Sequence, residues 1–152
     1  MIRNRLKENL KEAMKSKDKL KVSALRLIKA TLQDRDIAAR ERDSEEGITD
    51  EEILQMLTTM VRQRRDSIVA YEGGGRVDLA ESEQKEIDII SEFLPKQFDA
   101  TETEQAVKDV IAEIGAEGLK DMGKTMGALK GKYAGRMDFS KANAFVKAVL
   151  GA

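Results

Sequence analysis

Three charged residues lie on helix faces that are otherwise apolar, and their spacing could support acid–base chemistry. At 100° per residue Arg64 shares a face with Met60, and Glu83 and Glu86 lie beside Ile87 on a later segment. A charge on a core face needs a partner, because burying it alone costs several kcal/mol. We therefore expect a partly buried structural ion pair between Arg64 and Glu83 or Glu86. The alternative is a paired-carboxylate site in which one glutamate has a raised pKa.

The composition removes most other catalytic chemistry. The chain has 0 His and 0 Cys, which excludes cysteine and histidine nucleophiles, an imidazole base, and zinc sites built from these residues. The glycines at 73–75 precede Arg76 and lack the Lys-Ser/Thr ending of a phosphate-binding loop, so they predict the end of a helix. We expect no catalytic residue, no metal and no cofactor.

A second kind of chemistry, phosphate binding, is suggested by basic residues toward the C-terminus. Lysine and arginine release counterions when they contact RNA phosphates. The candidates for nucleic-acid contact are Lys124, Lys130, Lys132, Arg136 and Lys141, with Arg62 and Arg65 as a possible extension from an earlier helix. The alternative is a solvated charged face.

Gly123 and Gly127 lie one turn apart among these lysines, each weakening a helix by up to about 1 kcal/mol relative to Ala. Such a spacing suggests close approach of another backbone, either a neighbouring helix or a ligand. The accompanying methionines, Met122 and Met126, have core spacing.

The elements that must position these residues are helices. Hydrophobic residues make up 41 % of the chain and charged residues 36 %, with 1 Pro, and no segment alternates with period 2. We predict an all-α, multihelical fold: a larger N-terminal helical part and a C-terminal three-helix module. The expected N-caps are Asp18, Thr49 in a capping box, Asp78, Asp99 or Thr101, and Asp138 or Ser140.

Pro95 marks the expected domain boundary, because the residue before proline is pushed out of the helical region. We predict an N-terminal helical domain over 1–94 and a C-terminal helical domain over 95–152. The second helix should turn polar and enter solvent from Asp34 onward, and a loop is expected from Ser44 to Ile48.

The expected location is the cytoplasm, since no apolar run of signal-peptide or membrane-span length is present, and no membrane partner is expected. The net charge of -1 conceals segregation. Residues 1–33 carry ten basic residues against three acidic ones, and an acidic block over 45–52 follows.

With these segments in place, the whole chain resembles the GatB/YqeY family, small bacterial proteins similar to the tail of the B subunit of the tRNA-dependent amidotransferase. The resemblance rests on an ordered set of residues: Leu25-Arg26, residues 64–67, Tyr71, Arg76, Asp78-Leu79, residues 83–87, residues 94–97, residues 122–124, Met126-Gly127, Gly135-Arg136 and Asp138.

The resemblance implies that the domain over 95–152 is an amidotransferase-tail-like helical domain. It also implies a non-catalytic tRNA- or RNA-associated accessory protein, because the amidotransferase tail is thought to grip tRNA. The family label also implies carbon–nitrogen ligase activity with glutamine as amide donor. The amidase Ser-Ser-Lys machinery and the kinase-like catalytic part belong to other segments of that enzyme, so we expect this chain to assist rather than to catalyse. The alternatives are an auxiliary factor of that activity, with amidotransferase subunits as partners, or a protein-interaction module. The oligomeric state is left open.

Overall fold

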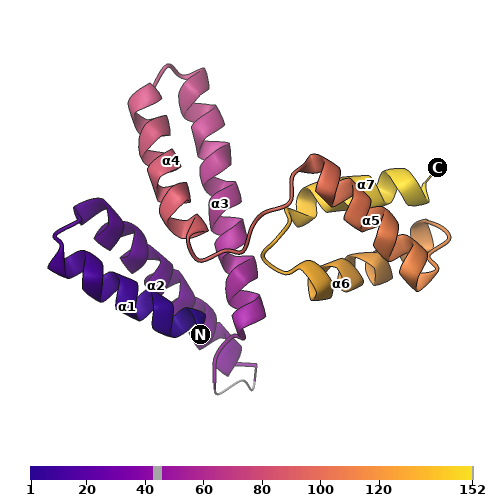
Figure 1. The fold of residues 1–152 in the computed structure, drawn as a ribbon, viewed down its shortest axis with the longest axis horizontal. Coiled ribbons are helices and arrows are strands. Elements are labelled where there is room, and N and C mark those ends of the chain that lie inside the picture. Colours follow the sequence, from indigo (N-terminus) through magenta and orange to yellow (C-terminus); the bar gives the residue numbers. More distant parts are fainter. Residues whose placement is uncertain (43–45, 152) are drawn as a thin grey trace. The chain divides into compact units, whose positions relative to one another are not determined.

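The described residues, 1–42 and 46–151 of a computed structural model, are almost entirely helical (Figure 1). They form seven α-helices and one short 3-10 helix, with no strand among them, and 79 % of these residues are helical. The all-α, multihelical prediction is therefore confirmed. Ser44, where the loop was expected to begin, and Glu45 of the acidic block lie outside the described residues. The chain divides into two compact units, Met1–Pro95 and Lys96–Ala152.

The first unit contains two helical hairpins. Helices α1 (Ile2–Lys15) and α2 (Lys19–Arg40) pack together, as do α3 (Asp50–Gly73) and α4 (Val77–Ser91) (Figure 1). Burial of apolar side chains holds them together. The largest fully buried side chains of this unit are Leu25, Ile28, Ile53, Met56, Leu57 and Ile90.

Two of the predicted caps in this unit are confirmed and one is wrong. Asp18 accepts the backbone N–H of Lys21 at 3.2 Å, and Thr49 forms the capping box with Glu52. Asp78 does not cap α4, because the helix begins at Val77 and Arg76 occupies the N-cap position. Its carboxylate instead accepts two bonds from the Arg76 guanidinium, both at 3.2 Å, and a neighbouring charge competes directly with capping.

A polar hub, made of Arg3, Asp36 and the backbone of Ile48, joins the start of α1 and the last turns of α2 to the segment just before α3. The Arg3 guanidinium donates to both carboxylate oxygens of Asp36, at 2.7 and 2.8 Å, and to the carbonyl of Ile48 at 2.8 Å. Asp36 also accepts the Ile48 N–H at 2.9 Å, and the bond from Arg3 is the main reason that its pKa is lowered. The expectation that α2 enters solvent from Asp34 holds only in part. Asp34, Arg35, Ile37 and Arg40 are exposed, but Asp36 is engaged in the hub and Ala39 is buried.

The first hairpin is also tied to the end of α4. Arg5 donates to the carbonyl of Glu92 at 3.0 Å and its guanidinium lies 5.4 Å from the centre of the Phe93 ring. Lys21 forms an ion pair with the Glu92 carboxylate at 3.5 Å. Arg5 and Lys21 thus connect the first hairpin to the end of α4 through polar contacts at the edge of the apolar core, where Phe93 is buried.

Arg64 of α3 and Glu86 of α4 meet across the second hairpin. Arg64 Nε donates to Glu86 Oε2 at 2.9 Å, and Nη1 donates to the carbonyl of Met60 at 3.1 Å. The Arg64 side chain is only 11 % exposed, so its charge depends on this partner. Glu83 is half-buried but forms no hydrogen bond or ion pair within the described part of the chain, so it does not share in the contact.

The second unit is a three-helix module with one extra turn. It contains α5 (Ala100–Ile114), the 3-10 helix η1 (Leu119–Asp121), α6 (Met122–Tyr133) and α7 (Phe139–Leu150) (Figure 1). Asp99 caps α5 in a capping box and Asp138 caps α7, which resolves both open cap assignments. Its buried core consists of Ala106, Val107, Val110, Leu129, Met137, Ala142, Val146 and Leu150.

The segment before α5 is held to the turn between α6 and α7. The backbone N–H of Phe98 donates to the carbonyl of Arg136 at 2.7 Å, and the Gln97 side-chain amide donates to the carbonyl of Gly135. Gly135 has a φ of 76°, a left-handed conformation that favours glycine. These bonds close the module around its core without a strand.

Gly47 is the glycine on which the polar hub depends, and its replacement should destabilise the first unit. It has a φ of 84°, and a Cβ there would lie 2.3 Å from Asp36 Oδ1. We expect Gly47→Ala to lower the free energy of unfolding by about 2 kcal/mol in urea denaturation, through backbone strain and loss of the hub geometry. Gly73→Ala is the control, because a Cβ there meets nothing within 4 Å. Equal stability of the two variants would contradict this account.

The contact between Arg64 and Glu86 gives a second stability prediction. Glu86→Ala should lower the free energy of unfolding by about 2 kcal/mol, because the largely buried guanidinium loses its counter-charge. The melting temperature should fall by several degrees. The matched control is Glu83→Ala on the same helix, which should change little. An unchanged melting temperature for Glu86→Ala would mean that the ion pair does not stabilise the hairpin.

Candidate nucleic-acid interface

The exposed side of α6 is made of only two residue types. Thr125 and Leu129 are fully buried, and Met122, Met126, Ala128 and Tyr133 are partly buried. All the exposed residues of the helix are glycine or lysine: Gly123, Lys124, Gly127, Lys130, Gly131 and Lys132. A helix whose solvent side lacks acids and bulky side chains is open to an anionic backbone.

The glycines form a row at one-turn spacing along this side. A Cβ built on Gly123, Gly127 or Gly131 would meet nothing within 4 Å. No neighbouring helix of the second unit therefore requires these glycines, and of the two explanations for Gly123 and Gly127 the neighbouring helix is wrong. The row leaves the helix backbone accessible, with Lys124 and Lys130 on its two sides at 100° per residue.

The five C-terminal cations differ in what they contact. Lys124, Lys130 and Lys141 are exposed and form no ion pair within the described part of the chain. Lys124 contributes to lowering the pKa of Asp121, although the main cause there is the hydrogen bond from the Glu117 N–H.

Lys132 and Arg136 are partly engaged by their neighbours. The ammonium of Lys132 donates to Glu113 at 3.3 Å, which raises the pKa of this lysine, and it also lies 5.5 Å from the centre of the Tyr133 ring. The Arg136 guanidinium lies 4.8 Å from the centre of the Phe98 ring. These two cations are less available to an anion than Lys124, Lys130 and Lys141, because each already has a partner.

Sequence reasoning missed the aromatic pair beneath these cations. Phe98 and Tyr133 are half-buried with ring centres 5.1 Å apart, and each ring carries one cation at its face. The available signal was the pairing of Tyr133 with Lys132 and the isolated aromatic after Pro95. A planar guanidinium above a ring can itself stack on a nucleobase.

The structure brings together only some of the predicted residues. Lys124, Lys130 and Lys132 share the exposed side of α6, Arg136 follows its C-terminal end, and Lys141 lies on α7. Arg62 and Arg65 are exposed on α3 in the first unit. Arg64 is engaged by Glu86 and is largely buried, so it contributes no charge to a surface.

The part of the chain that the structure describes contains neither a membrane-spanning helix nor a metal-binding cluster. None of these helices combines the length and apolar character needed to cross a membrane. No group of three or more acidic side chains among these residues is arranged to hold a metal ion.

Relatives of the chain are named as mitochondrial proteins, "Altered inheritance of mitochondria protein 41, mitochondrial". The protein from Candida glabrata is 40 % identical over 59 % of this chain and 47 % of its own length. That from Vanderwaltozyma polyspora is 30 % identical over 77 % of this chain and 64 % of its length, and that from Kluyveromyces lactis is 31 % identical over 58 % and 45 %. The chain thus spans about half to two thirds of these relatives.

The cytoplasmic location expected from the sequence is corrected by these names, which contradict it. The expectation rested on the lack of an apolar run. That criterion recognises secretory and membrane segments, but mitochondrial targeting segments are amphipathic and basic, so it does not distinguish mitochondrion from cytoplasm.

A family model described as "Yqey-like protein" matches residues 3–150. This range includes both units and every residue on which the resemblance rested, so the resemblance is confirmed. The chain belongs to the YqeY-like family.

Proposed function

We propose that this protein is a non-catalytic, RNA-associated accessory factor whose second unit binds the phosphate backbone of tRNA through α6. The observation that carries the proposal is the exposed side of α6, which presents glycine and lysine alone. The relation of the YqeY-like family to the C-terminal region of the amidotransferase B subunit supports tRNA as the class of RNA.

The physical argument is one of access and charge. Phosphate groups can approach the backbone closely at Gly123, Gly127 and Gly131, where no side chain stands in the way. Lys124 and Lys130 then reach the phosphates from the two sides of the row, and each contact releases condensed counterions. Contacts of this kind set affinity and orientation without reading sequence.

The aromatic pair adds a way to hold an unpaired base. The guanidinium of Arg136 lies over the Phe98 ring, 4.8 Å from its centre, and Arg136 follows the C-terminal end of α6. Recognition of RNA commonly combines phosphate contacts with stacking of a splayed base on an aromatic or guanidinium plane. An RNA loop rather than a regular duplex is therefore the preferred ligand.

The Met-rich face offers less support for the protein-interaction alternative. Met122 and Met126 are partly buried and pack against the core of the second unit, and Met137 is fully buried. These side chains stabilise the module itself, so a partner helix would have little methionine surface to contact. The role as an auxiliary factor of a glutamine-dependent ligase stays a second candidate, because it would use the same tRNA surface.

The proposal predicts salt-dependent tRNA binding that depends on two lysines. The double variant Lys124→Ala/Lys130→Ala should weaken binding of unmodified tRNA and reduce the slope of log K against log salt by about 1.5, since each lost phosphate contact removes 0.7–0.9. Fluorescence anisotropy over a salt series measures both quantities. The control is Lys108→Ala on α5, whose ammonium is paired with Glu104 at 3.4 Å. Binding without a salt slope, or none at low salt, would contradict the proposal.

The glycine row yields a separate prediction in which stability and binding change in opposite directions. Gly127→Leu should raise the melting temperature, because leucine favours a helix by up to about 1 kcal/mol over glycine and the site is open. It should nevertheless weaken tRNA binding several-fold by holding phosphates away from the backbone. If affinity is unchanged while the helix is stabilised, close backbone approach plays no part in binding.

A further inference from the structure

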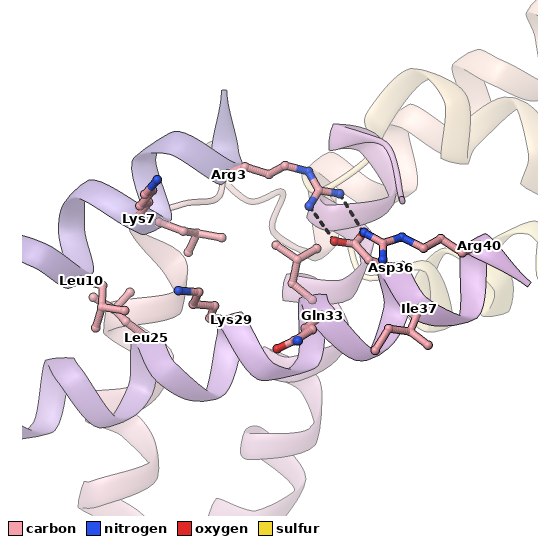
Figure 2. Close-up of a pocket in the computed structure, with 11 residues that line it drawn as sticks. Arg3, Lys7, Leu10, Leu25, Lys29, Gln33, Asp36, Ile37 and Arg40 are labelled. Atoms are coloured by element: carbon pink, nitrogen blue, oxygen red, sulfur yellow. Dashed lines mark hydrogen bonds and ion pairs between the residues drawn. The ribbon is translucent and has the colours of Figure 1, made fainter. Parts of the chain in front are cut away.

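A cavity of about 600 Å³ lies between α1 and α2, in the first unit and independent of the α6 surface (Figure 2). Its apolar lining comes from both helices: Leu6, Leu10, Leu25, Leu32 and Ile37. Leu25 is fully buried, whereas Ile37 is 48 % exposed, so the lining runs from the core out to solvent. A volume of this size is typical of sites that bind a ligand or a partner segment.

The rim of this cavity is strongly cationic. Arg3 and Lys7 stand on the α1 side and Lys29 and Arg40 on the α2 side, while Asp36 is the one acidic residue among the described residues of the lining (Figure 2). Arg3 neutralises Asp36 through the polar hub. Lys7 and Lys29 are exposed and form no ion pair with any described residue. Positive charge on both sides of an apolar floor calls for an occupant that is both apolar and acidic.

The distribution of charge favours a rod-shaped occupant over a single-headed amphiphile. On α2 the lining extends from Leu25 to Arg40, about four turns or about 22 Å at 1.5 Å per residue. The cations recur along this length, with Lys7 and Lys29 beside the leucines and Arg40 at the far end. A fatty acid carries charge at one end only, whereas an amphipathic helix can carry acids along both edges of its apolar face.

We propose that the groove between α1 and α2 is a docking site for an acidic amphipathic helix of a partner protein. The apolar face of that helix packs on the leucine floor, and its flanking glutamates or aspartates pair with Lys7, Lys29 and Arg40. Asp36 is held by Arg3 and does not repel the incoming acids. The packing of a third helix on the α1–α2 hairpin buries Ile37, which is otherwise left in solvent.

The test uses the full chain and a synthetic amphipathic helix of roughly five turns, with leucines at i, i+3, i+4 and i+7 and glutamates along both edges. Fluorescence anisotropy at low salt should show saturable one-to-one binding. Lys7→Glu/Lys29→Glu should weaken it roughly tenfold. The milder Lys7→Gln/Lys29→Gln variant should weaken it less, and it serves if the charge reversal unfolds the hairpin, which circular dichroism checks.

The matched control is Lys15→Glu/Arg35→Glu, which reverses one exposed charge on each of the same helices away from the cavity and should leave affinity within about twofold. A scrambled peptide of the same composition should not bind. The proposal is overturned if neither peptide binds or if both bind equally. It is also overturned if Lys7→Glu/Lys29→Glu and Lys15→Glu/Arg35→Glu change the affinity to the same extent. Saturable binding of decanoate without peptide binding, or loss of tRNA binding in Lys7→Glu/Lys29→Glu, would equally overturn it in favour of a small amphiphile or RNA.

Discussion

The first unit depends on one bidentate ion pair, in which the Arg3 guanidinium meets the Asp36 carboxylate. The two residues belong to different helices and are joined by the Ile48 backbone, which donates to Asp36 and accepts from Arg3. Three segments are thereby fixed by one polar cluster. The cluster keeps the ends of α1 and α2 in register, closes one end of the cavity between them, and explains why a left-handed glycine precedes Ile48.

Local features of the fold were predictable because they depend on residues close in sequence. The caps at Asp18, Thr49 and Asp99 and the left-handed glycine that ends α5 follow from side-chain chemistry within a few positions. The Asp78 cap failed because Arg76, two residues away, offers a stronger partner. The polar hub could not be predicted, since 33 residues separate its ion pair and a polar stretch after Asp34 looks like solvent-exposed helix.

The candidate surface was predictable in composition but not in detail. Basic residues toward the C-terminus identified the segment that contains α6, but its uninterrupted exposed side of glycine and lysine is seen only once the buried side of the helix is known. The sequence could not predict which lysines are neutralised, because the carboxylate that pairs with Lys132 belongs to Glu113 on another helix. The cavity in the first unit was equally hidden: the basic N-terminal segment was evident, but the gap between two packed helices depends on their separation.

The glycine row also has a consequence for how the second unit moves. α6 contains three glycines in twelve residues, so its own tendency to be helical is weak. Burial of Leu129 and Thr125, together with the partly buried Met122 and Met126, holds it in place. Such an element opens locally at a lower free energy than its neighbours. Its amide protons should therefore exchange with solvent before those of α5 and α7, so that the surface best suited to meet an anion is also the part of the module that opens most readily.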